Sequence, residues 1–317
     1  VCLARDLVNG PPIEVTPTRM GEVAEEIARE HGLEVKIFDK AALEAAGMNL
    51  ILAVSAGSDE EPRLIHLTYR PAGADKDTPQ VAFVGKGLTF DAGGYNIKPT
   101  GSIEDMKMDM AGGAAVLGAM SAVAAHKPNY VVHGIVPSSE NLISGSAYKV
   151  ADIIRSLNGK TVEVMNTDAE GRLILADALT YTERLGVDRI VDMATLTGAC
   201  MIALGPHCAG LWSNDDAFGE RLAAAAKRAG EDVWTMPLDK RLRSMLDSPN
   251  ADLKNVGKRW GGAITAALFL QEFVGDATWA HLDIAGPAFA EKGDTLTTSG
   301  GTGFAVATLL ELLGSEV

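Results

Sequence analysis

The stretch VEVMNTDAEGRLILADALTYTER at residues 162–184 joins a strand pattern, a polar turn and a helical pattern in direct succession. Residues 162–165 have the apolar character of a short strand, and residues 171–184 have the apolar spacing of a helix. A strand that leads directly into a helix is the repeating unit of α/β proteins. The stretch therefore predicts an α/β fold.

The same alternation continues on both sides of this stretch. Helices are predicted at residues 19–30, 41–46, 110–125, 218–229, 263–273 and 303–313, and strands at residues 34–38, 50–54, 64–69, 81–84, 130–136, 189–194 and 279–284. Strands that alternate with helices imply a largely parallel sheet covered on both faces. We therefore expect a three-layer αβα sandwich around a mostly parallel, mixed central sheet.

The net charge of the chain argues against two classes of binding partner. The formal net charge of the 317-residue chain is −14. Nucleic acids and anionic membranes attract clustered Lys and Arg, so neither is expected as a main partner. The chain also has no run of 18 apolar residues, the length that a membrane-spanning helix needs.

Cysteine usage points to a reducing compartment. Cys2, Cys200 and Cys208 are an odd number, and no CxxC pair occurs. A disulfide framework or a thiolate zinc site is therefore not expected, and a cytoplasmic location fits best.

Unusual residues follow three of the predicted strands. In open α/β sheets, ligands bind at the carboxyl ends of strands. The segments at those ends are GKGLTFDAGG at residues 85–94, NTDAEGR at residues 166–172 and ATLTGA at residues 194–199. The chemistry of the protein is expected where these three segments meet.

Four carboxylates in or near these segments suggest a metal centre. Asp168 and Glu170 are two residues apart, so in an extended backbone their side chains point to the same side. Asp91 lies in a glycine-flanked turn, and Asp109 lies at the start of the long helix predicted from residue 110. Four convergent carboxylates repel one another without cations, and two divalent cations would balance their charge.

Simpler interpretations of the same residues stay open at this point. Asp168 could cap a helix, and Glu170 could lie in its first turn. Lys86, between two glycines, could belong to an ordinary solvated turn. Other catalytic schemes are not supported, because HExxH, GxSxG and the P-loop pattern are all absent.

Five segments together resemble the signature set of the leucyl aminopeptidase (M17) family. They occur in the expected order over about 200 residues: VGKGLTFDAGGYNIKP at 84–99, MKMDMAGGAA at 106–115, NTDAEGRL at 166–173, ATLTGA at 194–199 and AHLDIAG at 280–286. The eight-residue block NTDAEGRL is the most specific of them. The resemblance implies the catalytic domain of a metal-dependent aminopeptidase.

The resemblance also implies a ligand set for two metal ions. The tighter site would use Lys86, Asp91, Asp109 and Glu170. The second would use Asp91, Asp168 and Glu170, with Asp168 contributing both its side chain and its main-chain carbonyl. Mn²⁺ or Zn²⁺ is expected, and Co²⁺ or Mg²⁺ would also suit the site. Lys86 would have to be neutral, which a neighbouring dication favours.

A mechanism follows from the resemblance. A metal-bridging water would attack the first peptide bond, Lys98 would polarise its carbonyl, and Arg172 would hold a bicarbonate ion as general base. The substrates would be peptides with a free amino terminus, beginning with Leu or another mainly apolar residue. The pocket for the first side chain would be lined by Met106, Thr195, Leu196, Gly198, Ala285 and Ala288.

Domain organisation and assembly follow in the same way. Residues 1–15 are expected to be the linker remnant of a missing amino-terminal domain, with linker character at residues 6–12, and residues 16–317 the catalytic domain. A homo-hexamer is expected. The alternative function is a DNA-binding, regulatory or structural relative that keeps the peptidase fold. The net charge and the intact ligand set argue against that alternative.

Overall fold

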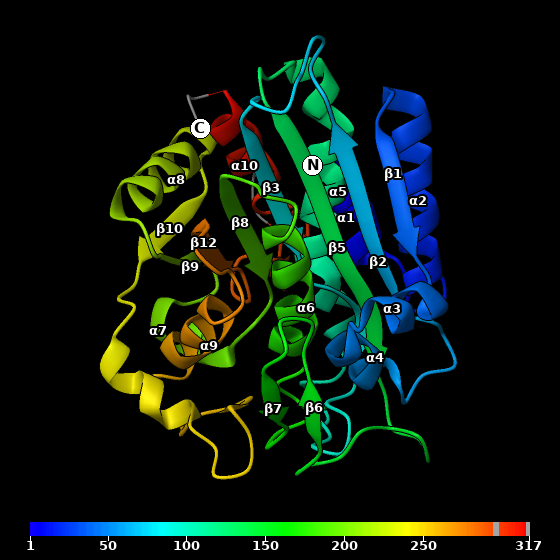
Figure 1. Ribbon diagram of the computed structural model, residues 1–317, viewed down its shortest axis with the longest axis vertical. Coiled ribbons are helices and arrows are strands. Elements are labelled where there is room, and N and C mark those ends of the chain that lie inside the picture. The colour runs from blue at the N-terminus through cyan, green and yellow to red at the C-terminus, as the bar shows by residue number, and fades with distance from the viewer. Residues whose placement is uncertain (294–297, 315–317) are drawn as a thin grey trace.

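The computed structural model describes residues 1–293 and 298–314. A nine-stranded sheet runs through the molecule, and eight of its strands lie side by side in Figure 1. Their order is β1 (Glu34–Phe38), β2 (Arg63–Tyr69), β5 (Val131–Asn141), β3 (Gln80–Gly85), β8 (Arg189–Ala194), β12 (Thr278–Asp283), β9 (Cys208–Ser213) and β10 (Asp232–Thr235). The ninth strand, β4 (Gly87–Asp91), pairs with β5.

Strand direction makes one edge of the sheet chemically distinct. The central strands β5, β3, β8 and β12 are parallel to one another, and β4 is parallel to β5. Antiparallel pairs occur on either side, where β2 pairs with β5 and β9 pairs with β12. The carboxyl ends of five strands therefore meet at a single edge. The predicted mostly parallel, mixed sheet is confirmed.

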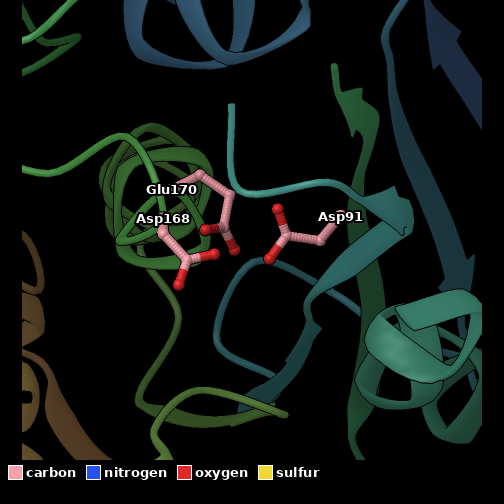
Figure 2. Close-up of side chains that lie close together, drawn as sticks. All are labelled: Asp91, Asp168 and Glu170. Atoms are coloured by element: carbon pink, nitrogen blue, oxygen red, sulfur yellow. The ribbon is translucent and has the colours of Figure 1, made fainter. Parts of the chain in front are cut away.

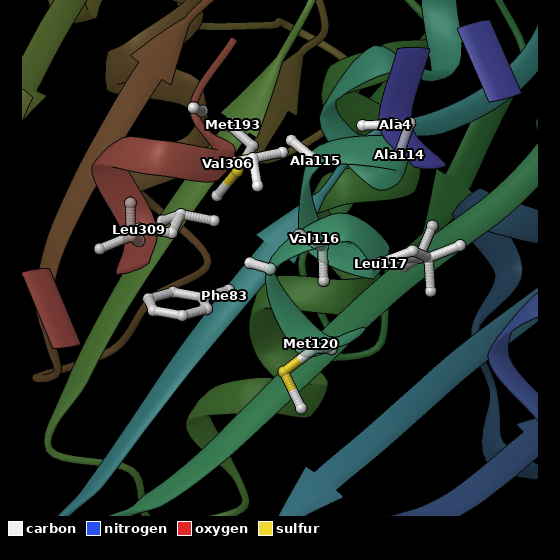
Figure 3. Close-up of a cluster of buried hydrophobic side chains, with 14 of the residues drawn as sticks. Ala4, Phe83, Ala114, Ala115, Val116, Leu117, Met120, Met193, Val306 and Leu309 are labelled. Atoms are coloured by element: carbon white, nitrogen blue, oxygen red, sulfur yellow. The ribbon is translucent and has the colours of Figure 1, made fainter. Parts of the chain in front are cut away.

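One face of the sheet is covered by α1 (Cys2–Asn9), α2 (Pro17–His31), α5 (Ala111–His126), α8 (Asp216–Ala229) and α10 (Val306–Leu313). Figure 3 shows the centre of this layer, where Val116 of α5 and Leu309 of α10 lie near Phe83 of β3. These side chains are fully buried, so their packing removes apolar surface from water and stabilises this layer.

The opposite face is covered by α3 (Lys40–Ala46), α4 (Asn49–Ser55), α6 (Gly171–Glu183), α7 (Gly198–Leu204) and α9 (Gly262–Gln271). Successive residues of β3 alternate between the two layers. Phe83 contributes to the first core and Val84 to the second. This alternation follows from the two-residue repeat of a strand, and it confirms the predicted three-layer arrangement.

Smaller elements complete the chain. They are β6 (Ile153–Arg155), β7 (Thr161–Glu163) and β11 (Leu253–Lys254) in a three-stranded sheet, β13 (Phe289–Ala290) paired with β14 (Gly300–Gly301), and the 3-10 helices η1 (Met106–Met110) and η2 (Lys240–Leu246).

The prediction of a strand at residues 50–54 is wrong, because these residues form helix α4. The Asp177 side chain of α6 explains the difference. Its carboxylate accepts hydrogen bonds from the backbone N–H groups of Leu50 at 2.8 Å and Ile51 at 3.3 Å. These are donors that the first turn of a helix cannot satisfy internally, so Asp177 favours a helix that begins here.

The linker expected at residues 6–12 is partly helical. Helix α1 ends at Asn9, and its residues Leu7 and Val8 are buried in the first core. The Asn9 side chain accepts a hydrogen bond from the Gly301 backbone at 2.7 Å, so α1 is joined to the carboxyl-terminal part of the fold. The division into a linker at residues 1–15 and a catalytic domain stays a prediction.

Among the described residues, one helical segment, Met106–His126, is long and apolar enough to cross a membrane. Most of this segment is buried inside the molecule. It comprises η1 and α5, and α5 packs against the sheet as a core helix.

Candidate metal centre

The predicted site residues come from the edge where the parallel strands end. Lys86 lies between β3 and β4, and Asp91 is the last residue of β4. Asp109 lies in η1, directly before α5. Asp168 and Glu170 lie in the turn that leads from β7 into α6. Elements far apart in sequence therefore bring these five side chains to one edge of the sheet.

Lys86 lies at the centre of a first group of contacts. Its Nζ is 2.8 Å from both carboxylate oxygens of Asp109 and 2.8 Å from Glu170 Oε1. It also donates to the Thr195 backbone carbonyl at 3.0 Å. All three charged side chains are at most 6% exposed, so these charges interact with little screening by water.

Lys98 lies at the centre of a second group. Its Nζ is 2.8 Å from Asp91 Oδ2 and 2.6 Å from Asp168 Oδ1. The other Asp91 oxygen accepts hydrogen bonds at 2.8 Å from the Gly93 backbone and from the Asn141 side chain. Asp91 is therefore held on both sides of its carboxylate.

The two groups meet at three carboxylates. Figure 2 shows Asp91, Asp168 and Glu170 pointing toward one another from two different segments. One oxygen of each lies within 4.8 Å of the others. Glu170 Oε2 is buried and has no hydrogen-bond partner among the residues that the structure describes. A buried carboxylate oxygen without a partner is costly, and a divalent cation is a ligand that would satisfy it.

Charge balance supports the same interpretation. In their ionised forms, Asp91, Asp109, Asp168 and Glu170 would carry four negative charges, against two positive charges on the lysines. A surplus of two negative charges therefore remains in a mostly buried space. One or two dications, with carboxylate oxygens and an amine as ligands, fit this donor set.

The pKa values of these groups reflect their crowding. Burial raises the pKa of Asp91 well above its usual range, and the charges of Glu170 and Asp109 raise it further. Burial lowers the pKa of Lys86, but the carboxylates of Asp109, Glu170 and Asp91 outweigh that effect and raise it overall. Both pKa values rise because the group has more negative than positive charge. A bound proton adds positive charge and so stabilises the group.

Two glycines allow Lys86 to reach its position. A Cβ atom on Gly85 would lie 2.3 Å from the Gly112 carbonyl oxygen, so β3 and α5 can approach this closely only without side chains. A Cβ atom on Gly171 would lie 2.5 Å from Lys86 Cε. The side chain of Lys86 therefore passes over the first residue of α6.

Capping does not explain Asp168 and Glu170. The residue before α6 is Glu170, and its side chain makes no capping hydrogen bond. The Asp168 side chain contacts Lys98 instead. Of the interpretations open from the sequence, the structure favours a shared charged site over a helix cap.

Arg172 is buried in the first turn of α6. Its Nη1 donates to the Asn255 carbonyl at 2.9 Å, and its Nε has no partner among the described residues. Burial lowers the pKa of Arg172 to about 10, although the charges of Glu170 and Asp283 act in the opposite direction. A buried guanidinium donor without a partner is suited to an anion.

The predicted pocket residues fall into two sets. The Thr195 hydroxyl donates to Asp109 Oδ1 at 2.6 Å, and the backbone N–H groups of Leu196 and Ala285 both donate to Asp283 Oδ1 at 3.2 Å. These three residues are therefore tied to the charged centre or to one another. The others are the partly exposed Met106 in η1, the exposed Gly198 at the start of α7, and the buried Ala288 after β12.

Sequence reasoning missed three polar residues that support this edge. Asn141 holds Asp91, Asn255 contacts Arg172, and Asp283 orients the backbone at Leu196. Asn141 ends a strand of the sheet and Asp283 lies within the block AHLDIAG, but a strand-end position alone does not distinguish a residue that supports a site from one that faces water.

Comparison with known proteins identifies a family. A model of the cytosol aminopeptidase family, catalytic domain, matches residues 2–310. Probable cytosol aminopeptidases of Picosynechococcus sp. and Cyanothece sp. are 54% identical over 311 residues and 53% identical over 317 residues. These matches cover 98% and 99% of this chain, but only 63% and 64% of the relatives. The chain therefore spans less than two thirds of the length of these curated relatives.

Solved structures give a similar result. The bottromycin maturation enzyme BotP in complex with Mn superposes with a TM-score of 0.94 at 43% identity. The match covers 98% of this chain and 69% of that protein. A second structure of that enzyme gives a TM-score of 0.92, also at 43% identity, and covers 98% of this chain and 68% of that one.

Proposed function

Since this chain belongs to the cytosol aminopeptidase family, we propose that it is a metal-dependent aminopeptidase. It hydrolyses the first peptide bond of peptides that have a free amino terminus. The observation that carries the proposal is the mostly buried group of four carboxylates and two lysines at the carboxyl edge of the sheet, with its surplus of negative charge.

Two metal ions are assigned to this group. The first would be held by Lys86, Asp91, Asp109 and Glu170, and the second by Asp91, Asp168 and Glu170. Support comes from the convergence of Asp91, Asp168 and Glu170 and from the unpartnered Glu170 Oε2. Mn²⁺ is the first candidate, because the similar enzyme BotP was solved in complex with Mn; Zn²⁺ is the second.

The protein side chains supply the rest of the chemistry. A pair of dications would lower the pKa of a bound water and polarise the substrate carbonyl. Lys98 stays protonated: burial lowers its pKa, but the neighbouring carboxylates, Asp91 first and then Glu170, Asp109 and Asp168, outweigh burial and raise the pKa overall. Its ammonium group therefore donates to the carbonyl oxygen, where negative charge develops in the transition state.

Arg172 is assigned to an anion next to the reacting groups. Its Nε, which has no partner among the described residues, and its position two residues after Glu170 suit a bicarbonate ion. Bicarbonate would accept a proton from the attacking water, and the guanidinium would hold the ion in place.

The pocket for the side chain of the first substrate residue is proposed at the same carboxyl edge of the sheet. We assign it to Met106, Thr195, Leu196, Gly198, Ala285 and Ala288, with a preference for Leu and other mainly apolar first residues. Hydrogen bonds that join Leu196 and Ala285 through Asp283 support a pocket wall formed by the ends of β8 and β12.

We also propose a cellular location and an assembly for the protein. The names of the relatives as cytosol aminopeptidases agree with a cytoplasmic enzyme, and a homo-hexamer remains the proposed assembly. The alternative of a DNA-binding, regulatory or structural relative is not favoured, because the charged groups that a peptidase needs lie together at one site.

A pair of substrates tests the proposal. Metal-loaded protein is mixed with leucinamide and, separately, with N-acetyl-leucinamide, and released ammonia is measured. We expect hydrolysis of leucinamide alone, because a free amino group is needed to place the first peptide bond at the centre.

Two outcomes contradict the proposal. Equal hydrolysis of both compounds would show that the amino group takes no part in recognition. Undiminished hydrolysis of leucinamide by a Glu170→Gln variant would show that this centre does not perform the reaction.

A further inference from the structure

A cavity lies at the end of the sheet opposite to the metal centre. Its volume is about 510 Å³, within the range of small-molecule sites. Gln80 and Val131, at the amino-terminal ends of β3 and β5, line it together with Tyr181 near the end of α6. Tyr181 is nine residues from Arg172 in α6, roughly 14 Å along the helix axis. No proposed metal ligand lines this cavity.

A chain of hydrogen bonds runs along one wall of this cavity. Tyr181 Oη is 2.9 Å from His66 Nδ1, His66 Nε2 is 2.9 Å from His133 Nδ1, and His133 Nε2 is 2.9 Å from Gln80 Oε1. The Gln80 carbonyl oxygen can only accept, so His133 carries its hydrogen on Nε2. His66 then donates from Nε2, and the Tyr181 hydroxyl donates to His66 Nδ1.

This chain uses all four ring nitrogens with both histidines neutral. Burial, with smaller contributions from the charges of Lys36 and Arg70, lowers the pKa of His66 to about 4. Burial is also the main cause that lowers the pKa of His133 to about 3. The Tyr181 oxygen keeps an acceptor position, and the Gln80 amide nitrogen keeps its two hydrogens as donors. The wall is therefore a neutral, ordered polar surface.

Positive charge predominates around the opening. Lys36, Arg70 and Lys76 line the cavity together with two carboxylates, Glu34 and Asp75. Glu34 is paired with Arg70 at 3.0 Å, and Asp75 accepts hydrogen bonds within its own turn, from the Thr78 hydroxyl at 3.1 Å.

The two lysines have no such partner. In the part of the chain that the structure describes, neither Lys36 nor Lys76 is paired with a carboxylate. The cavity lining therefore carries a surplus of one positive charge, on a chain whose net charge is −14.

We propose that this cavity is a second ligand site, which takes a small oxyanion bearing a carboxylate or a phosphate group. The oxyanion lies between Lys36 and Lys76, where its charge is balanced, and accepts a hydrogen bond from the Gln80 amide. A donor group elsewhere on the ligand can bond to the Tyr181 oxygen. The site goes beyond the proposed peptidase reaction and shares no residue with it.

Calorimetric titration of the metal-loaded protein tests this site. Succinate and inorganic phosphate are the two probes, and they distinguish a carboxylate ligand from a phosphate ligand. We expect one of them to bind at a site that a Lys36→Gln/Lys76→Gln variant weakens about tenfold, because two charges are lost. An anion held by Arg172 would form a separate site, which this variant leaves unchanged. Both lysines are exposed, so the variant is expected to keep its fold.

A matched control separates the cavity from general electrostatics. The Lys149→Gln/Lys227→Gln variant removes the same charge from two exposed positions outside the cavity, and it is expected to bind the probe as the unchanged protein does. Failure of both probes to bind at millimolar concentration would overturn the proposal. So would an affinity that the cavity variant leaves unchanged, which would place the anion at the metal centre, or one that both variants reduce equally.

Discussion

Lys86 and Lys98 carry the same charge in different surroundings. Lys86 is 3% exposed and is enclosed by Asp109, Glu170 and the Thr195 carbonyl. Lys98 is 15% exposed and lies between Asp91 and Asp168 on the more open side of the group. The more open position is the one that a substrate can reach, which is why the two lysines are given different roles.

Removal of Lys98 should therefore affect the rate more than the fold. A Lys98→Ala variant is expected to lose about 100-fold or more in kcat toward leucinamide, because the ammonium group stabilises charge that develops in the transition state. KM should change much less, since that charge is absent from the bound substrate. Steady-state kinetics with both enzymes in the same metal buffer measures the difference.

Lys149→Ala is the control for this substitution. Lys149 is exposed, and its Nζ lies 3.7 Å from Asp152 instead of among the four carboxylates of the centre. Its kcat should equal that of the unchanged protein. A kcat for Lys98→Ala within threefold of the same value would mean that Lys98 does not act on the carbonyl.

The charged residues of the site could be predicted because they follow strand ends and repeat a family pattern. Asn141 and Asp283 could not, although they hold Asp91 and the backbone at Leu196. Amides and carboxylates occur throughout the chain, and nothing local distinguishes one that supports a site from one that faces water. Their roles depend on pairings between residues 50 and 87 positions apart.

Among the secondary-structure elements, α4 is one whose type the local sequence pattern did not predict. A short apolar run such as residues 50–54 suits a buried strand and a buried helix equally well. Asp177 favours the helix, because its carboxylate accepts a hydrogen bond from the backbone N–H of Leu50, 127 positions away. Sequence periodicity cannot reveal a contact of this kind.

The close approach of β3 and α5 is a second feature of elements. The backbone N–H of Gly113 donates to the Lys86 carbonyl at 2.7 Å. The backbone N–H of Lys86 donates to the Met193 carbonyl at 3.0 Å. A Cβ atom on Gly112 would lie 2.2 Å from that Met193 oxygen and 3.0 Å from the Lys86 nitrogen. The backbone at Lys86 therefore requires a glycine at position 112.

A Gly112→Ala variant should lose both stability and activity. We expect the free energy of unfolding to fall by about 2 kcal/mol, since backbone atoms must move to admit the methyl group. Urea unfolding gives this value. Activity should fall in parallel, because Lys86 and its contacts to Asp109 are displaced.

Gly145→Ala is the matched substitution. Gly145 is exposed, and a Cβ atom there would meet nothing within 4 Å. Its free energy of unfolding should stay within about 0.5 kcal/mol of the unchanged value. Equal stability of the two glycine variants would contradict the proposed close packing.

At the scale of the whole molecule, the class of fold could be predicted but the strand order could not. Alternating patterns indicate a covered parallel sheet wherever they occur in the chain. The insertion of β5 between β2 and β3, and the antiparallel direction of β9, arise from long-range pairing. These pairings leave no signal in local periodicity.

The buried histidine pair should make stability depend on pH. The pKa of His66 is lowered to about 4 and that of His133 to about 3, mainly by burial, from an ordinary value near 6.5. Below pH 6.5 the unfolded chain therefore binds protons that the folded chain does not bind. The free energy of unfolding should fall as the pH falls from 6.5 to about 4, by up to about 1.4 kcal/mol per pH unit for each histidine.

Urea unfolding at pH 7 and pH 5 checks this dependence. A His66→Gln/His133→Gln variant should lose less stability between the two pH values than the unchanged protein does. The exposed His31 and His126 provide the control pair, and their glutamine variant should lose as much as the unchanged protein. The same loss in all three proteins would show that the buried pair is not the cause.

Titration of chelator-treated protein with Mn²⁺, followed by leucinamide hydrolysis at each point, tests the two-metal centre most directly. We predict two bound ions per chain, no hydrolysis without them, and loss of the weaker ion in an Asp168→Asn variant that keeps the tighter one. Hydrolysis that persists after the metal has been removed, or binding of both ions that Asp168→Asn leaves unchanged, would contradict the assignment of this centre.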